Sequence, residues 1–269
     1  MKELSLQELK EIEFDILKMF HKFCQENNIR YFLAYGTLLG AIRYKGFIPW
    51  DDDVDVLVPR EDYERLITLF QDSEKYRLFS YEKDCSYLFP YAKICDMTTK
   101  KEEFVDNSKL DLGVDIDIFP LDAWDDDLEK AKKEAKYIKR NMFYLGLSKR
   151  KKPDSVNPIK RFIKGVSMIF CKLMGSEFFL KKILKASNKP EQKGNNYVGS
   201  KSWCVYGARG IIPAEAFAEA IEIPFEGEMF FAPKGYDTYL TCLYGDYLPE
   251  PPKEKQKTHH SFKAYRLQE

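Results

Sequence analysis

The sequence predicts an α/β (α+β) protein in which helices flank a short mixed sheet, with an α-rich insertion in the middle of the chain. The first observation is the order helix, strand, turn, strand, helix that the N-terminal part predicts. The second is that carboxylates alternate with apolar residues in two segments, 53–58 and 114–119, as is typical of strands. The third is a charged stretch with helical periodicity at 126–146 and 159–174.

The composition indicates a globular protein with a sizeable core, because 44% of the 269 residues are hydrophobic and 15% are aromatic. Lys+Arg and Asp+Glu both number 43, which argues against bulk nucleic-acid binding. The basic residues are concentrated, with 14 basic and 2 acidic residues between Lys139 and Lys189. The chain starts without the apolar core of a signal peptide, and no run approaches the roughly 18 apolar residues of a membrane span, so we expect a cytoplasmic protein. The six cysteines form no CxxC pair, which argues against a zinc site and a disulfide framework.

The first predicted elements are a helix and a buried strand. Ser5 and Glu8 form a capping box, and apolar residues follow at helical spacing. The apolar run 31–35 then predicts a strand that ends in a turn at Gly36 and Thr37. Because Gly36 has no Cβ, backbone N–H groups can approach a ligand closely there, and a phosphate would fit.

Residues 51–58 place a carboxylate cluster at the start of a second strand. Asp53 and Asp55 alternate with valines, so both carboxylates leave the same face. Like charges this close repel unless a cation lies between them, and oxygen ligands without interleaved Cys or His suit Mg²⁺ or Mn²⁺. A calcium-binding EF-hand loop is excluded because its sixth position here is Val56 instead of Gly. A solvated acidic turn is the alternative, but the alternation into an apolar strand favours a functional site.

The elements that follow are a helix and three strands, predicted at residues 59–70, 76–81, 89–97 and 114–119. In the last strand Asp115 and Asp117 point to the same face, so the pattern alone leaves open which of them supplies a third metal ligand. Asp122 follows in a turn, where we expect it to cap the next helix.

The middle of the chain predicts two helices. The first covers 126–146 and stops near Gly146. The second, at 159–174, is amphipathic, and its apolar face comprises Ile159, Phe162, Ile163, Val166, Ile169, Phe170, Leu173 and Met174. This pattern favours a helix packed on the core with its lysines in water. The alternative is an interfacial helix that lies on anionic lipid, which would give the protein a peripheral contact with the inner face of the cell membrane.

The last third returns to short elements. We expect β-like segments at 203–206 and 210–213, a short helix at 214–219 and a hairpin within 223–232. The adjacent histidines near the end of the chain are typical of a surface, but His260 is a candidate for reaching the active site.

The stretch YGTLLGAIRYKGFIPWDDDVDV at 35–56 resembles the LicD family of phosphotransferases, within the DNA polymerase β-like nucleotidyltransferase superfamily. The superfamily pattern is a Gly and a small hydroxyl residue, a spacer, Asp-apolar-Asp-apolar, and a third Asp on a later strand. The segments 40–43 and 46–52 match additions specific to LicD proteins. In that family the third Asp precedes an apolar-Phe-Pro sequence, which selects Asp117. The resemblance extends to the Tyr-Gly-Asp-aromatic element at 244–247 and is weak across the basic middle.

The resemblance implies a nucleotidyltransferase-like catalytic core in residues 1–126, a basic helical insertion in 127–200, and a segment, 201–269, that completes the catalytic domain. It implies two Mg²⁺ or Mn²⁺ ions held by a carboxylate triad. We expect a catalytic role for Asp53, Asp55 and Asp117 as metal ligands and for Arg43, whose planar fork can grip phosphate oxygens or else pair with a nearby acid. The expected substrate-binding residues are Gly36, Thr37, Lys45, Trp50, Asp52 and His260, with packing as the alternative role of Trp50.

The activity implied is the transfer of phosphocholine from CDP-choline to a sugar hydroxyl of a cell-envelope glycan, with release of CMP. The acceptor would be a precursor of teichoic acid or lipopolysaccharide type, which can be lipid-linked. The alternative activity is the transfer of another substituted phosphate, ribitol- or glycerol-phosphate, from its CDP donor. A second hypothesis is a plain nucleotidyltransferase that releases pyrophosphate, against which the match at 43–52 argues. A third is a non-enzymatic binding module, against which the self-repelling acids argue.

Overall fold

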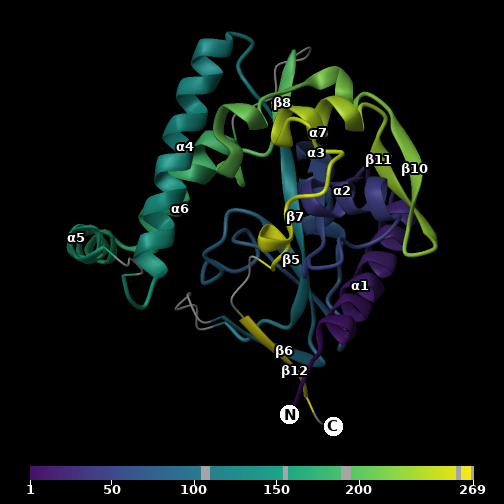
Figure 1. Ribbon diagram of the computed structural model, residues 1–269, viewed down its shortest axis with the longest axis horizontal. Coiled ribbons are helices and arrows are strands. Elements are labelled where there is room, and N and C mark those ends of the chain that lie inside the picture. The colour runs from purple at the N-terminus through teal and green to yellow at the C-terminus, as the bar shows by residue number, and fades with distance from the viewer. Residues whose placement is uncertain (104–109, 154–156, 189–194, 259–261, 268–269) are drawn as a thin grey trace.

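A mixed sheet forms the centre of the protein, and five of its strands follow one another across it (Figure 1). The computed structural model describes residues 1–103, 110–153, 157–188, 195–258 and 262–267. The strands follow one another across the sheet in the order β2 (Phe32–Leu33), β3 (Asp55–Pro59), β7 (Val114–Ala123), β5 (Ala92–Asp96) and β4 (Tyr76–Phe79). The β3–β7 pair is parallel and the other pairs along this path are antiparallel. The predicted α/β class with a mixed sheet is confirmed.

Three helices of the N-terminal part accompany the sheet. Helix α1 (Leu6–Glu26) begins with the predicted capping box and packs against β7 and β5. Helix α3 (Arg60–Leu69) follows directly after Pro59, close to the predicted bounds. Helix α2 (Tyr35–Tyr44) corrects the prediction of a turn after a five-residue strand, because the chain turns at Tyr35, with φ 44°, and becomes helical at once.

Helices α4 (Leu128–Lys149), α5 (Pro158–Met174) and α6 (Ser176–Ser187) lie within 127–200, the segment predicted as a basic insertion and called the insertion below. They are to the left of β7 in Figure 1. They gather around a second hydrophobic cluster that includes Ile138 and Ile183, completed from outside the insertion by Trp124 and Cys204. This separate core is not evident from the sequence alone. Helix α4 also continues past Gly146, because the buried leucines on either side of it offset the modest cost of a helical glycine. None of the helices in the described part of the chain has the length and apolarity of a membrane span.

The segments on either side of the insertion add smaller sheets. A three-stranded sheet, in the order β1 (Lys2–Glu3), β12 (Phe262–Arg266) and β6 (Thr99–Glu103), brings the two ends of the chain together at the bottom of Figure 1. The predicted hairpin is confirmed as β10 (Ala220–Phe225) and β11 (Glu228–Pro233), joined at Glu226 and Gly227, which both have positive φ.

Of the elements predicted in the last third, the β-like segment at 203–206 is wrong, whereas a strand lies within 210–213 and a short helix within 214–219. The 3₁₀ helix η1 (Cys204–Gly210) occupies most of the stretch predicted as β-like at 203–206. The short helix expected at 214–219 is a 3₁₀ turn, η2 (Ala214–Phe217). The other elements are β8 (Tyr197–Gly199), β9 (Ile212–Pro213), α7 (Tyr236–Tyr244) and the 3₁₀ turn η3 (Lys253–Lys255).

Candidate active site

Three carboxylates lie together where β3 and β7 run side by side. Asp55 opens β3 and pairs in register with Asp117 of the parallel strand β7, so the two side chains leave the same face of the sheet. Asp53 precedes Asp55 by two residues, and all three acids line one pocket of about 490 Å³. The structure therefore brings together the three residues expected to act as metal ligands.

The pKa values of these acids reflect their crowding. Burial raises the pKa of Asp55 well above its ordinary value, and the negative charges of Asp53 and Asp117 raise it further. Burial also raises the pKa of Asp117, to about 6, although the ammonium group of Lys93 acts in the opposite direction. Holding both carboxylates ionised at neutral pH therefore calls for positive charge beside them.

Lys93 supplies part of that charge, and sequence reasoning missed it. On β5 it pairs in register with Asp117, so that Lys93, Asp117 and Asp55 form a row across three adjacent strands. Its buried Nζ contacts both Asp117 Oδ1 and Asp115 Oδ2. A lysine within the apolar strand predicted at 89–97 was the available signal, since a buried lysine needs acidic partners.

The lysines also distinguish the two acids that the sequence left open. Asp115 contacts Lys93 and lies 2.7 Å from the Nζ of Lys101. Although burial favours the neutral acid, Lys101 and Lys93 together hold the pKa of Asp115 far below its usual range. Asp115 is thus engaged by two cations, whereas Asp117 lies opposite Asp55, and this arrangement favours Asp117 as the third acid of the site.

The chemistry of the triad fits a divalent cation. Asp53, Asp55 and Asp117 offer carboxylate oxygens, which Mg²⁺ and Mn²⁺ prefer, and a cation would relieve the repulsion that raises the pKa of Asp55. Within the described residues, no three His, Cys, Asp or Glu side chains are already arranged as a metal site. Because Lys93 contacts one oxygen of Asp117, a metal and this lysine would share that carboxylate.

The glycine and threonine at the start of α2 support the acidic segment. Thr37 Oγ1 accepts a hydrogen bond from the backbone N–H of Asp55 at 2.8 Å, which ties α2 to the first residue of β3. A Cβ at Gly36 would lie 2.7 Å from Asp51 Oδ2, so the glycine permits a close approach of the helix and the acidic run. Asp52 is buried at the pocket and accepts a hydrogen bond from Thr258 Oγ1 at 3.0 Å.

Three other expected site residues, Arg43, Lys45 and Trp50, do not join the acids. Arg43, on α2, donates hydrogen bonds to the carbonyl groups of Tyr247 and Pro249, so it fastens the C-terminal segment and does not line the pocket. Lys45 is exposed at the left-handed C-terminus of α2. Trp50 is half-buried and packs edge-on against Tyr44. His260 lies outside the described residues.

Aromatic side chains form the wall of the pocket beside the acids. The ring centroids of Tyr91 and Phe119 are 4.5 Å apart, and Trp203 lies 5.5 Å from Tyr91 and 5.7 Å from Phe119. The ammonium group of Lys93 lies 5.7 Å from the centroid of Tyr91 and 5.9 Å from that of Phe89. The pocket therefore combines carboxylates, cations and ring faces that already attract a positive charge.

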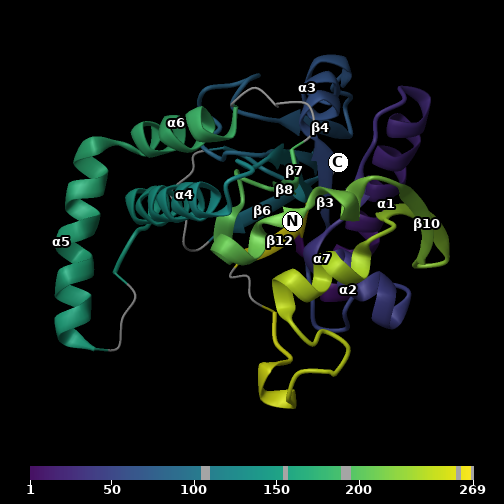
Figure 2. The same ribbon diagram turned by 90° about the horizontal axis from the view of Figure 1, so that it is seen from above.

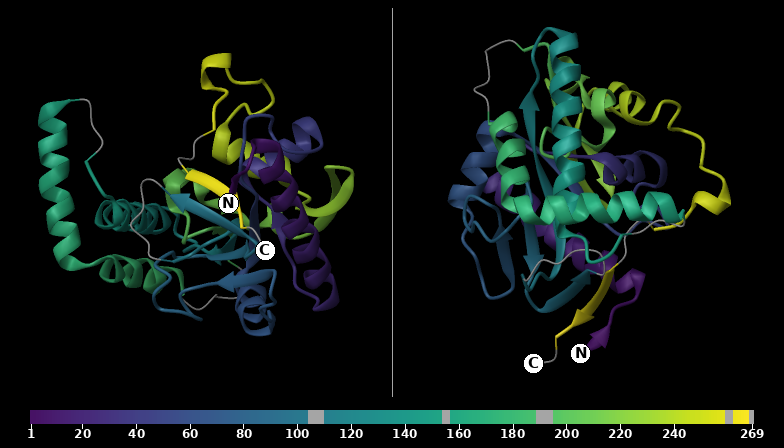
Figure 3. Two further views of the ribbon diagram at one scale, coloured as in Figure 1. Left: turned by 90° about the horizontal axis from the view of Figure 1, so that it is seen from below. Right: turned by 90° about the vertical axis from the view of Figure 1, so that its left-hand side faces the viewer.

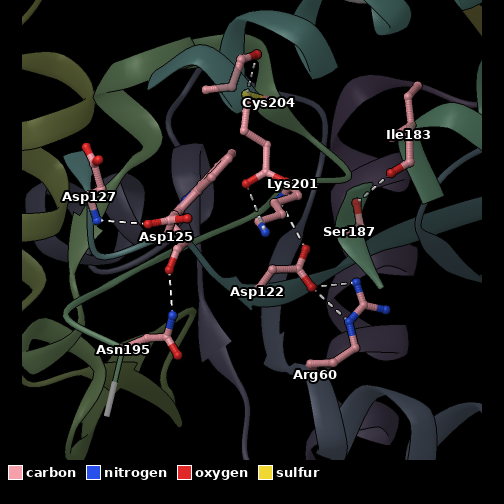
Figure 4. Close-up of polar contacts among 12 residues, drawn as sticks. Arg60, Asp122, Asp125, Asp127, Ile183, Ser187, Asn195, Lys201 and Cys204 are labelled. Carbon is pink, nitrogen blue, oxygen red and sulfur yellow. Dashed lines mark hydrogen bonds and ion pairs between the residues drawn. The ribbon is translucent and has the colours of Figure 1, made fainter. Parts of the chain in front are cut away.

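A buried ion pair beyond the pocket joins the core to the helical insertion (Figure 4). Asp122 lies 2.6 Å from Arg60 Nη2 and accepts a hydrogen bond from the backbone N–H of Lys201. The Nζ of Lys201 in turn lies 3.5 Å from Glu134 on α4. The cap of α4 is Asp127, so the prediction that Asp122 caps this helix is wrong. Burial raises the pKa of Asp122 to about 6.

Comparison with known proteins identifies the family. Residues 28–149 match the family model described as LicD/FKTN/FKRP, nucleotidyltransferase domain. The chain is 33% identical over 277 residues to the lipopolysaccharide cholinephosphotransferase LicD of Haemophilus influenzae, and the alignment covers 99% of this chain and 100% of that protein. Uncharacterized proteins of Rickettsia prowazekii and Rickettsia typhi are each 45% identical over 49 residues, which is 18% of this chain and 18% and 16% of those proteins. With a match over nearly its whole length, the chain belongs to the LicD family of phosphotransferases.

Proposed function

We propose that the protein transfers phosphocholine from CDP-choline to a sugar hydroxyl of a cell-envelope glycan, of lipopolysaccharide or teichoic acid type, and releases CMP. The observation that carries this proposal is the pairing of Asp55 with Asp117 in a pocket that also has an aromatic wall. The Haemophilus influenzae relative is named a lipopolysaccharide cholinephosphotransferase. This name supports phosphocholine as the transferred group and an acceptor of lipopolysaccharide type.

Asp53, Asp55 and Asp117 would hold Mg²⁺ or Mn²⁺, which when bound orients phosphates and neutralises their charge. The chain's own cations add to this, because Lys93, Lys101, Lys149 and Arg150 all line the pocket and suit a diphosphate. In the reaction the acceptor oxygen attacks the phosphorus that carries choline, and the proton of the hydroxyl is released to solvent. The bond to CMP breaks, and CMP leaves with its electron pair.

The aromatic wall favours choline over ribitol or glycerol as the transferred group. A quaternary ammonium group cannot donate a hydrogen bond and is stabilised mainly by contact with ring faces. Tyr91, Phe119 and Trp203 place such faces beside the acids that would hold the phosphates. A polyol would instead be held by hydrogen bonds, to which the faces of these rings contribute little.

Product analysis of the purified protein tests the proposal. The protein is incubated with Mg²⁺, CDP-choline and a lipopolysaccharide acceptor, and CMP is measured by chromatography for the wild type and for Asp53→Asn and Asp117→Asn. We expect both variants to lose CMP release, while Asp111→Asn, at an aspartate with a 90% exposed side chain, keeps it. Consumption of CDP-ribitol or CDP-glycerol in place of CDP-choline would show that the transferred group is ribitol- or glycerol-phosphate. Formation of pyrophosphate from nucleoside triphosphates alone would identify a plain nucleotidyltransferase.

A further inference from the structure

Helix α5 turns its apolar face away from the rest of the protein. Figures 2 and 3 show α5 at the edge of the molecule, outside α4 and α6. Its large apolar side chains are exposed to an extent unusual for a globular protein, with Phe162 73% exposed, Leu173 82% exposed and Phe170 61% exposed. The other exposed apolar residues of this face are Ile159, Ile163, Val166, Ile169 and Met174. The helix therefore does not pack on the core through its apolar stripe, which the sequence pattern favoured.

The opposite side of α5 is the one that packs. Met168 and Cys171 are buried in the hydrophobic cluster of the insertion. At about 100° per residue, Met168 lies about 180° around the helix from Ile159. The outward direction of the apolar face is therefore fixed by a packed anchor on the other side of the helix. It does not result from a helix that is detached from the protein.

The charges on α5 indicate what covers the apolar face. Residues 158–174 contain four basic residues and no acidic residue. Lys160 and Lys172 are exposed on the polar flanks of the stripe, and the preceding residues 149–152 are all Lys or Arg. An apolar stripe with only positive charge along it complements a surface that is apolar within and negative outside, as a bilayer with anionic headgroups is.

We propose that α5 is an interfacial helix that lies on an anionic membrane with residues such as Phe162 and Phe170 inserted below the headgroups. The neighbouring helices also carry exposed rings, with Phe143 on α4 57% exposed and Phe178 on α6 38% exposed. Helix α4 packs against α5 and contributes Lys149 to the lining of the pocket, so the same insertion links the membrane contact to the active site. A lipid-linked acceptor would then be presented at the surface to which the protein is bound.

Vesicle binding tests this inference without relying on the proposed activity. The full chain is sedimented with vesicles of phosphatidylcholine alone and with vesicles that also contain phosphatidylglycerol. Three variants are compared with the wild type: Phe162→Ser/Phe170→Ser, Lys160→Gln/Lys172→Gln, and Met229→Ser as a matched control on the β10–β11 hairpin, at a side chain 46% exposed. Circular dichroism and thermal unfolding establish that each variant is folded, which the exposure of the replaced side chains favours.

We expect the wild type and Met229→Ser to bind the anionic vesicles. The phenylalanine variant should lose binding by on the order of a hundredfold, because two large apolar side chains no longer enter the bilayer. The lysine variant should lose on the order of tenfold on anionic vesicles and little on neutral ones. Absence of wild-type binding, or binding that the phenylalanine variant retains, would overturn the inference. So would a wild-type dimer that Phe162→Ser/Phe170→Ser dissociates, since the face would then join two copies of the chain. Membrane binding without CMP release would leave this inference standing while the proposed function fails.

Discussion

Replacement of Lys93 by Met tests whether this lysine balances the acids from within the sheet. The side chain of Lys93 is 5% exposed and contacts Asp115 and Asp117, whose side chains are 3% and 18% exposed. Removing one member of a buried ion pair typically costs about 3–5 kcal/mol, because the remaining charge stays in a poorly solvated place. Two features of this site reduce that cost. Asp115 keeps Lys101 as a partner, and Asp117, with a pKa of about 6, can take up a proton with little expense near neutral pH.

We therefore expect Lys93→Met to lower the free energy of unfolding by about 3 kcal/mol, at the low end of that range. The measurement is urea unfolding at pH 7 in a metal-free buffer. Lys100→Met serves as the control, because Lys100 is on β6 with a side chain 36% exposed and should change stability by no more than about 0.5 kcal/mol.

A double-mutant cycle with Asp117→Asn separates the ion pair from the packing of the lysine stem. If the two charges interact directly, the double variant should be more stable than the sum of the single effects predicts, by about 1–2 kcal/mol. Additive effects, or a Lys93→Met variant as stable as Lys100→Met, would refute the interpretation that Lys93 neutralises Asp117.

Three further predictions concern pH, donor selectivity and packing. The native pKa of Asp122 is about 6, above its ordinary value of 3.8, so the folded state binds the proton more tightly and this group's stabilisation is lost as the pH rises from about 4 to 6. Between pH 4 and 6 this group should lower the free energy of unfolding by up to about 3 kcal/mol, and Asp122→Asn should lack that decrease. Urea unfolding across this range measures it, and an equal decrease in the wild type and the variant would contradict the raised pKa of Asp122. Tyr91→Leu should raise KM for CDP-choline by on the order of tenfold while Tyr91→Phe changes it little, and an equal loss with CDP-glycerol would show that the ring contacts the nucleotide. A Cβ at Gly40 would lie 2.4 Å from the carbonyl oxygen of Gly46, so Gly40→Ala should cost about 2 kcal/mol in thermal unfolding. Gly146→Ala, with open space around it, should instead gain about 0.5–1 kcal/mol, and a loss there would contradict the packing argument.

The acids on the central strands were predictable because their signal is local. Alternation with apolar residues places Asp53 and Asp55 on one face of a strand, and the same pattern occurs around Asp117. The row that includes Lys93 was not predictable, because it depends on the antiparallel register of β5 on β7, and no local pattern specifies which residue of one strand faces which residue of another. A buried lysine in a strand is the clue that sequence reasoning can use.

Helical periodicity predicted α5 but not the direction in which its faces point. An apolar stripe usually packs on a core, yet here the anchor is made by Met168 and Cys171 on the other side. The position of Arg43 was missed for a related reason. The sequence pattern predicted a turn at Gly36 and Thr37, whereas the chain is helical there and α2 continues through Arg43. The helix directs Arg43 to the carbonyl groups near Tyr247, more than 200 positions away. In both cases the outcome depends on contacts between segments distant in the sequence.

The pocket draws its acids and two of its rings, those of Tyr91 and Trp203, from different parts of the chain. Asp55 and Asp117 belong to the only parallel strand pair of the described sheets, where a register shift would disrupt both strands. Tyr91 lies just before β5, and Trp203 just before a 3₁₀ helix. Substitution at these two positions would therefore change the wall of the pocket without changing the strand register that pairs the two acids.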